Sequence, residues 1–212
     1  MSPYGQRSPL IDAFMQKNQE INLSALRTPE DIYQKHILDS SELAHLVRAA
    51  DYAGPDPQQW RRALDVGTGW WFPLLPLAHL LPDITRYGID ARRKKIRAVE
   101  EIAHRCGYTN VHLIWWRIEE HPDRYDLLTA RAVTLSDTLI PWLYPRLTPR
   151  GCIVLYKMFT DEEDMLIRHL LASAPWKHKL RLVLRHTYTL PDSDIPRILY
   201  ILQDIALQKH RR

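Results

Sequence analysis

The residues of this sequence that are best spaced for chemistry lie in the stretch LDVGTGWWFPLL, residues 64–75. An apolar run ends near Asp65, and Gly67 and Gly69 follow at alternate positions. Glycine adopts backbone angles that bulky residues avoid, so this turn lets main-chain N–H groups approach a ligand closely. Asp90 ends the next apolar run, where a carboxylate can accept both hydroxyls of a ribose. These features predict a site for a cofactor that contains a nucleoside.

Asp65 discriminates between the cofactors that such a turn can serve. In a dinucleotide-binding loop, a carboxylate two residues before the first glycine would repel the neighbouring phosphates. The same carboxylate suits a cofactor that carries an amino group and a sulfonium, both of which are cationic. We therefore expect S-adenosyl-L-methionine as the cofactor.

The histidine and acidic residues show no spacing that is typical of a catalytic site or a metal site. The acidic run at 161–164 begins a predicted helix, where negative charge suits the helix dipole. We interpret four scattered histidines as surface or structural residues: His104, His112, His121 and His169. The sequence therefore predicts no metal site and no nucleophile paired with a base.

Cysteines and tryptophans also have structural interpretations. Cys106 and Cys152 lack metal-ligand spacing, and two cysteines in this context predict reduced thiols rather than a disulfide framework. Trp115 and Trp116 lie on a predicted strand, where we expect core and interface contacts. The alternative is that these aromatic rings, beside arginine, hold an unpaired base.

Length and composition place the chain among ordinary globular proteins. Its 212 residues, 45% of them hydrophobic, suit one domain with a small extension. The first residues lack the charged and apolar regions of a signal peptide, and no apolar run approaches the roughly 18 residues of a membrane span. We expect a cytoplasmic protein with no membrane partner.

The positive charge of the chain is clustered. Net charge is +4, and the basic residues gather at 92–95, 177–181 and 209–212. Such clusters favour a polyanionic partner through release of counterions. Solvated helix ends and a frayed terminus explain the same pattern equally well, and charge alone does not separate the two.

The elements that must position the glycine turn form two parts. The first sixty residues read as helices: one starts at Ser8-Pro9, another at Thr28-Pro29 with its cap and acidic first turn, and a third covers 40–50. Gly54 to Pro57 then breaks the helical pattern. We predict an N-terminal helical cap over 1–57 and a cofactor-binding domain over 58–212.

Strands and helices alternate after this boundary. The expected strands cover 62–66, 84–89, 111–118, 125–130, 152–156, 180–188 and 198–205, with helices over 73–81, 92–106, 135–147 and 161–172. Alternation of this kind predicts a doubly wound, mostly parallel α/β sheet that ends in a strand pair. In such a sheet the ligand lies beyond the carboxyl ends of the strands, beside the first one.

Several segments resemble, in order along the chain, the bacterial small-subunit ribosomal RNA guanine-N7 methyltransferase family, also called the glucose-inhibited division protein B family. They are NLSALR (22–27), HILDS (36–40), LDVGTGWWFPLLPLA, the tripeptide RAV (131–133), and YTLP (188–191) followed by Arg197. The resemblance implies a class I methyltransferase (Rossmann-like) fold with a seven-stranded sheet. It also implies transfer of a methyl group from S-adenosyl-L-methionine to N7 of a guanine in small-subunit (16S) rRNA, by a monomer whose partner is ribosomal RNA or the small ribosomal subunit.

The resemblance also implies roles for individual residues. Gly67, Gly69 and Phe72 match the methionine end of the cofactor site, and Ile118-Glu119 matches a pair beside the adenine. His36 and Asp39 match a signature at the mouth of the site. With the spacing above, the predicted cofactor-binding set is Asp65, Gly67, Thr68, Gly69, Phe72, Asp90, Ala91, Ile118, Glu119 and Arg131. The predicted catalytic residues are Arg131 and Lys157, and the predicted RNA contacts are Lys35, His36, Arg92, Arg93 and Arg197.

The chain departs from the family where it has Trp71, since the family usually has glycine there. Two interpretations follow: the indole covers an occupied pocket as a lid, or it fills the cofactor space. We favour the lid, because Asp65, Gly67, Gly69 and Asp90 are all retained.

Three functions therefore stay open, with the rRNA methyltransferase ahead. The second is a former methyltransferase that binds RNA or the ribosome without using the cofactor. The third is a small-molecule methyltransferase on the same fold, against which the basic clusters count.

Overall fold

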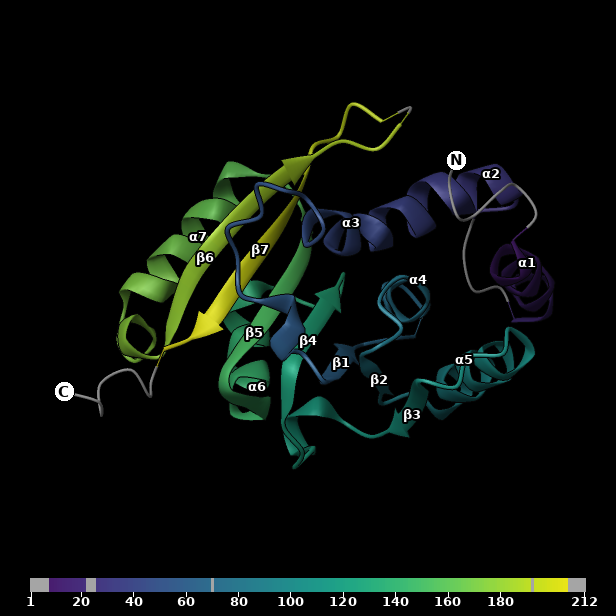
Figure 1. Cartoon of the computed structure of the whole chain (residues 1–212), viewed down its shortest axis with the longest axis horizontal. Helices are drawn as coiled ribbons and strands as arrows, with labels where there is room; N and C mark the ends of the chain where they lie inside the picture. Colours follow the sequence, from purple (N-terminus) through teal and green to yellow (C-terminus); the bar gives the residue numbers. More distant parts are fainter. Residues whose placement is uncertain (1–7, 22–25, 70, 192, 206–212) are drawn as a thin grey trace.

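The computed structural model describes residues 8–21, 26–69, 71–191 and 193–205. These residues form one seven-stranded sheet in the order β3-β2-β1-β4-β5-β7-β6 (Figure 1). The strands are β1 Arg62–Val66, β2 Thr85–Asp90, β3 Val111–Trp115, β4 Tyr125–Arg131, β5 Leu147–Met158, β6 Leu180–Tyr188 and β7 Arg197–Asp204. β7 is antiparallel to β5 and β6, whereas the other neighbours are parallel. The predicted doubly wound sheet and its closing strand pair are confirmed.

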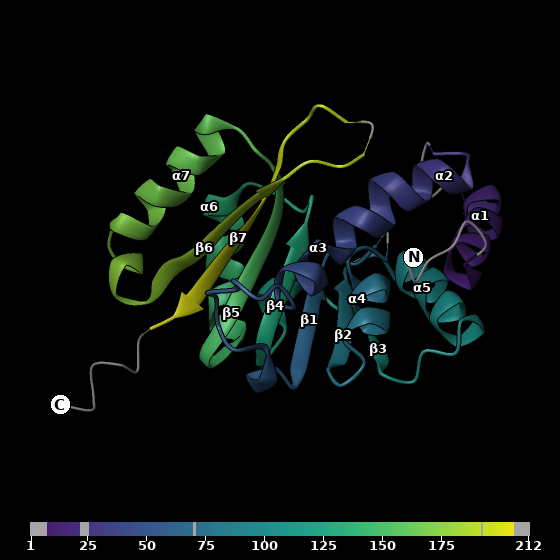
Figure 2. The ribbon, with the colours of Figure 1, turned by 45° about the horizontal axis from the view of Figure 1, so that its top comes forward.

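Helices cover both faces of the sheet (Figure 2). One face packs against α1 Pro9–Ile21, α3 Asp39–Leu46, α4 Leu74–Leu80 and α5 Arg93–Arg105, and the other against α6 Ser136–Leu143 and α7 Asp161–Ala172. In α5, Ile96, Val99 and Ile102 form a buried stripe, which is the helical spacing of an amphipathic helix. Because successive strand residues point to opposite faces, Asp65 and Thr129 lie on the α3–α4 side while Val66 and Ala130 lie on the other.

The N-terminal helices belong to the same hydrophobic core as the sheet. Thr28 caps α2 Pro29–Ile32 by accepting a hydrogen bond from the Asp31 N–H at 3.1 Å, as the sequence predicts. The helix continues through one π-helical segment, η1 Tyr33–Leu38, into α3. Phe14, Ile32 and Ile37 pack in one cluster with β-strand residues such as Val154. The division of the chain at residue 57 stays a prediction.

Some element bounds differ from those predicted. β3 ends at Trp115 rather than at 118, because the chain turns there and forms the 3₁₀ segment η3 Ile118–Glu120. β5 begins at Leu147 rather than at 152, because Leu147 pairs with Tyr125 before a bulge in β4. Three further 3₁₀ segments are η2 Pro57–Gln59, η4 Tyr144–Arg146 and η5 Trp176–His178.

Some sequence features lie outside the described residues. They are part of the NLSALR segment (22–25), Trp70, and the basic tail at 209–212. Within the described ranges, no helix combines the length and the apolar character that crossing a membrane requires.

Candidate cofactor site

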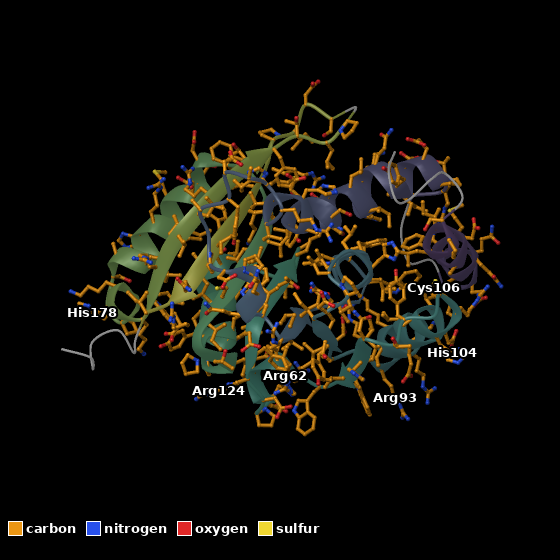
Figure 3. All side chains as sticks on the ribbon, viewed as in Figure 1. Arg62, Arg93, His104, Cys106, Arg124 and His178 are labelled. Carbon is orange, nitrogen blue, oxygen red and sulfur yellow. The ribbon has the colours of Figure 1, made fainter. Side chains whose placement is uncertain are left out.

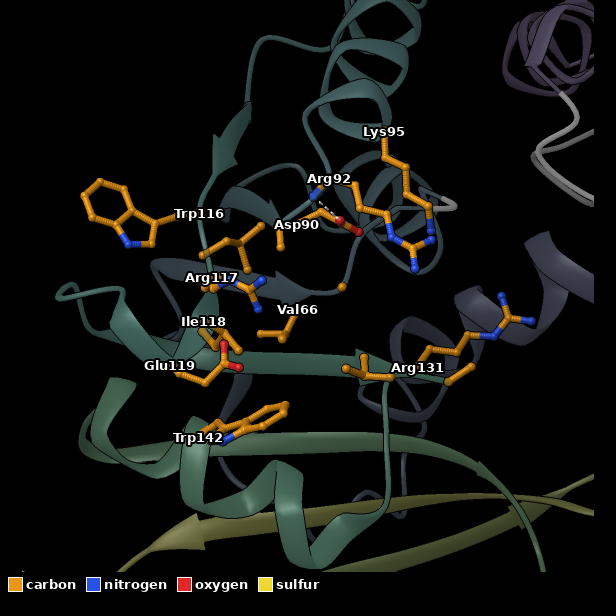
Figure 4. A pocket seen from close by; sticks show the side chains of 15 residues that line it. Val66, Asp90, Arg92, Lys95, Trp116, Arg117, Ile118, Glu119, Arg131 and Trp142 are labelled. Carbon is orange, nitrogen blue, oxygen red and sulfur yellow. Dashed lines mark hydrogen bonds between the residues drawn. The ribbon is translucent and has the colours of Figure 1, made fainter.

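A pocket of about 390 Å³ opens beyond the carboxyl ends of β1, β2 and β4 (Figure 4). This volume lies within the range of natural small-molecule sites. Six residues of the predicted cofactor-binding set line it: Gly67, Asp90, Ala91, Ile118, Glu119 and Arg131. The other lining residues are Val66, Ile89, Arg92, Lys95, Trp116, Arg117, Ala132, Val133 and Trp142. The pocket therefore lies where the order of strands predicts the ligand.

Gly67 shapes one wall of the pocket. Its φ of 69° lies in the left-handed region that glycine tolerates and side chains resist. A Cβ at this position would lie 2.9 Å from Cγ2 of Val133, which follows β4. The N–H groups of Gly67 and Thr68 both donate to the Ile89 carbonyl oxygen, at 3.0 and 3.1 Å. The turn after β1 is thus tied to the end of β2 and packed against the loop after β4.

Asp90 and Gly69 meet on the opposite side of the turn. Asp90 Oδ1 accepts a hydrogen bond from the Arg92 N–H at 2.8 Å. Its other oxygen, Oδ2, lies 2.6 Å from the point that a Cβ on Gly69 would occupy. Cδ of Lys95 lies still closer to that point and Nζ of Lys95 lies 2.6 Å from it, so only glycine fits between the carboxylate and the lysine side chain. Asp90 itself lines the pocket, where its carboxylate can accept the ribose hydroxyls that the sequence predicts.

Lys95 and Arg92 add positive charge at this end of the pocket. Burial lowers the pKa of Lys95, and the nearby Asp90 carboxylate opposes that effect. Arg92 is a predicted RNA contact, and the structure places it in the pocket lining. Lys95 was not singled out as a site residue. Its place in the first turn of α5, directly after the acid-ended β2, is the signal that could have identified it.

Asp65 lies beneath the turn, with 3% of its surface exposed, and does not line the pocket. Its Oδ1 accepts a hydrogen bond from Thr129 Oγ1 at 2.8 Å. Burial raises the pKa of Asp65 to about 7, although the buried Arg86 guanidinium on the same face of the sheet favours the charged carboxylate. Thr68 and Gly69 are buried beside it and also lie outside the lining. Cofactor contacts by these three residues stay predictions.

Trp71, the departure from the family pattern, lies in the hydrophobic core. The indole is completely buried and lies outside the pocket lining. Its ring meets Phe14 of α1 edge-on, with centroids 4.8 Å apart. Its φ of 67° turns the side chain toward the N-terminal helices. The indole thus packs in the core and does not line this pocket, and its effect on cofactor binding stays a prediction.

Phe72 belongs to the same aromatic cluster. It is buried, stacks on His36 with centroids 4.8 Å apart, and lies 5.6 Å from Phe14. Burial, reinforced by the charge of Arg131, lowers the pKa of His36 to about 3. The structure thus places Phe72 and His36 in a packed layer behind the turn, outside the pocket lining. Their predicted contacts with cofactor and RNA stay predictions.

Arg131 lines the pocket but directs its guanidinium away from it (Figure 4). Arg131 Nε forms an ion pair with Asp39 Oδ2 at 2.7 Å, and Nη2 donates to the Lys35 carbonyl oxygen at 3.0 Å. Asp39 is 1% exposed and also binds Arg197 at 3.3 Å and the Tyr188 hydroxyl at 2.8 Å. The HILDS segment thus holds two of the predicted site arginines in one buried network.

Lys157, the second predicted catalytic residue, lies outside the pocket lining. Its ammonium forms an ion pair with Glu163 at 2.9 Å and donates to the Thr134 carbonyl oxygen at 3.1 Å. Glu163 also accepts a hydrogen bond from the Ser136 hydroxyl. This geometry ties the loop after β4 to α7, and a catalytic role for Lys157 stays a prediction.

The remaining predicted residues lie on the surface. Lys35 forms an exposed ion pair with Asp31 at 2.6 Å, and the Arg93 guanidinium lies 4.9 Å from the centre of the Trp115 ring. No group of three or more histidine, cysteine, aspartate or glutamate side chains in the described ranges could hold a metal ion.

Comparisons with solved structures agree with this fold. The chain matches the magnesium protoporphyrin IX methyltransferase of Synechocystis, solved with bound SAM, with a TM-score of 0.62 at 15% identity, covering 95% of this chain and 99% of the other. It matches TrmN from Thermus thermophilus with a TM-score of 0.54 at 20% identity, covering 81% and 53%. At these identities the matches show the fold alone, which is that of class I methyltransferases.

Sequence comparisons identify the family. The family model described as rRNA small subunit methyltransferase G matches residues 6–182. A relative named ribosomal RNA small subunit methyltransferase G, from Deinococcus radiodurans, is 35% identical over 88% of this chain and 72% of its own length. Relatives of the same name from Bacteroides fragilis and Leuconostoc citreum are 31% and 27% identical, and the chain covers 79% and 65% of their lengths. The chain therefore belongs to the rRNA small subunit methyltransferase G family.

Proposed function

We propose that this protein transfers a methyl group from S-adenosyl-L-methionine to ribosomal RNA of the small subunit, with N7 of a guanine as the acceptor. The observation that carries the proposal is the Asp90 carboxylate, which lines, together with Gly67, a pocket at the carboxyl ends of the strands. The family of the chain supports the reaction and the substrate class.

The pocket residues fit this cofactor by chemistry. Asp90 offers a charged acceptor for the ribose hydroxyls, and Gly67 lets the main chain approach the ligand. Ile89, Ile118 and Trp142 supply apolar surface for a flat base. When bound, the cofactor supplies an electrophilic methyl group on a sulfonium.

The acceptor chemistry also matches the lining. N7 of neutral guanine carries a lone pair and no proton, so its methylation requires in-line placement and no general base. Neither histidine nor cysteine contributes to the lining of the pocket among the described residues. Placement of two reactants can supply roughly 7–11 kcal/mol of the barrier reduction. The protein would therefore act mainly by holding the acceptor base and the cofactor in register.

Arg131 has a positioning role in this proposal. Its ion pair with buried Asp39 anchors the end of β4, and Ala132 and Val133, which follow it, form the wall opposite Asp90. Ala132 has a φ of 53°, which is unfavourable for a residue with a side chain. The anchoring of its neighbour Arg131 stabilises this backbone conformation. The HILDS segment thus fixes the shape of the pocket through Arg131.

The alternative of an inactive RNA-binding module depends on Trp71 crowding the cofactor. The packing of that indole in the core against Phe14, outside the pocket lining, supports the enzyme over this alternative. We further propose that the protein works as a cytoplasmic monomer on the small ribosomal subunit or its RNA.

The test is mass mapping of small-subunit rRNA from cells that lack the protein, before and after treatment with purified protein and cofactor. The proposal expects one guanine to gain a methyl group with wild type and with the control variant Asp83→Ala, which changes an exposed residue outside the pocket lining. Asp90→Ala should lose most of this activity. Unmodified RNA after treatment with wild-type protein would refute the proposal.

A further inference from the structure

Two tryptophans at the end of the edge strand β3 remain unused by the function above. Trp115 and Trp116 have 54% and 49% of their surfaces exposed, although an indole in water forgoes much favourable burial. They are adjacent in sequence, and Trp116 lines the rim of the cofactor pocket (Figure 4). Large exposed aromatic side chains at the mouth of a site favour an interaction surface.

Trp115 is held in place rather than loose. Its Nε1 donates a hydrogen bond to the Ala91 carbonyl oxygen at 3.0 Å, and the Arg93 guanidinium lies 4.9 Å from its ring centre. A ring fixed in this way loses little conformational freedom when a partner stacks on it. Trp115, Trp116 and Arg93 together form what we call the tryptophan platform.

Positive charge continues from the platform along α5. Arg93 lies over Trp115 and also borders a shallow hollow with Lys94, Arg97 and the ion pair of Lys17 with Glu101. Figure 3 shows Arg93 on the outside of the molecule beside β3 and α5. On the other side of the platform, Trp116 and Arg117 reach the cofactor pocket. The platform thus connects the pocket with a basic surface.

We propose that the tryptophan platform stacks an unpaired RNA base next to the target guanine, while Arg93 and the α5 cations contact the adjoining phosphates. The inference rests on the proposed function. Aromatic faces interleaved with arginine and lysine are the chemistry that single-stranded RNA uses, because every base has a stacking face and every linkage a negative charge. A target base that must reach the pocket leaves its stack, and its neighbour then needs a new stacking partner.

The test measures binding of a fluorescent small-subunit rRNA fragment by anisotropy. Trp115→Leu removes the stacking face and should weaken RNA binding about tenfold, whereas Trp115→Tyr keeps an aromatic face and should bind nearly as wild type. Trp176→Leu is the matched control, since that indole lies beside Lys179 near β6, at the opposite edge of the sheet. Arg93→Gln should weaken binding and reduce its salt dependence.

Cofactor affinity, measured by calorimetry on the same variants, separates the possible results. Loss of RNA binding with unchanged cofactor affinity in Trp115→Leu supports the platform. RNA binding equal to wild type, or parallel losses of RNA and cofactor affinity, would overturn it. In that case the platform proposal fails, even though the wild-type protein still methylates RNA. A wild-type protein that neither binds nor methylates the RNA would refute the proposed function itself.

Discussion

The turn after β1 has one side that faces the pocket and another that packs into the hydrophobic core. On the pocket side, Gly67 lies so close to Val133 that a Cβ would come within 2.9 Å of it, and Asp90 lines the pocket. On the core side, Trp71 and Phe72 are buried against Phe14 and His36. Bulky residues next to a cofactor loop therefore need not obstruct it, because a single backbone angle directs them into another layer. Each prediction below changes one side and measures both the stability of the fold and the affinity for the cofactor.

The largest effect is expected on the core side. Trp71→Ala should lower the free energy of unfolding by about 3–5 kcal/mol, because it removes a fully buried indole. Cofactor affinity of the folded protein should stay unchanged. Urea unfolding and calorimetry measure the two quantities. Trp142→Ala, on the pocket side, should lower cofactor affinity and should cost less stability than Trp71→Ala, because this indole is only partly buried against the core. A loss of cofactor affinity in Trp71→Ala equal to that in Trp142→Ala would abolish the distinction.

On the pocket side, Asp90→Ala should weaken cofactor binding by about 1.5–3 kcal/mol, because it removes charged acceptors for the ribose hydroxyls. Stability should change little, since Asp90 is only half-buried. Calorimetric titration with the cofactor and with its demethylated product checks this result, with Asp83→Ala as control. Equal affinities for both variants would show that Asp90 is not the ribose acid.

Two glycines with similar backbone angles sharpen the comparison further. Gly67→Ala and Gly107→Ala should each lose about 1–2 kcal/mol of stability, because φ values of 69° and 72° strain any side chain. Only at Gly67 would the new methyl group press on Val133, whereas nothing lies within 4 Å at Gly107. Cofactor affinity should therefore fall in Gly67→Ala alone. Similar affinities in both variants would show that the Val133 contact does not shape the pocket.

The smallest effect near neutral pH concerns His36 on the core side. Its pKa falls to about 3 in the folded protein from an ordinary 6.5, mainly through burial. The unfolded chain then binds the extra proton, so this residue removes stability as the pH falls from about 6.5 toward 3. His36→Gln should flatten that part of the urea-midpoint profile. If His36→Gln left the urea-midpoint profile between pH 6.5 and 3 unchanged, His36 would not be buried in the packed layer.

In the same measurement, the contribution of Asp65 to the pH dependence of stability should have the opposite sign to that of His36. Its pKa is raised to about 7 from 3.8, so the folded protein binds the extra proton, and this residue removes stability as the pH rises from about 4 to 7. Asp65→Asn should lift the profile on the alkaline side. If both substitutions changed the slope of stability against pH with the same sign, one of the two side chains would not be buried in the way that the structure shows.

The sequence alone determined the sheet and the place of the site. Alternating strand and helix patterns, Gly67 and the acid-ended β2 are local signals. The strands and helices alternate as predicted, and Gly67 and Asp90 line the pocket. The family segments likewise indicated the cofactor and the reaction. Such properties depend on period, turn chemistry and short spacing, which neighbouring residues express without reference to the rest of the chain.

Only the tertiary structure decided where individual side chains point. Trp71 and Phe72 turn toward α1, and the guanidiniums of Arg131 and Arg197 bind Asp39, although all four were weighed as site residues on sequence grounds. Trp142 lines the pocket without any local signature, and the only local signal for Lys95 is its place directly after the acid-ended β2. The directions of those four side chains depend on partners 57 to 158 residues away, because a buried charge or ring adopts the direction in which a distant partner can satisfy it.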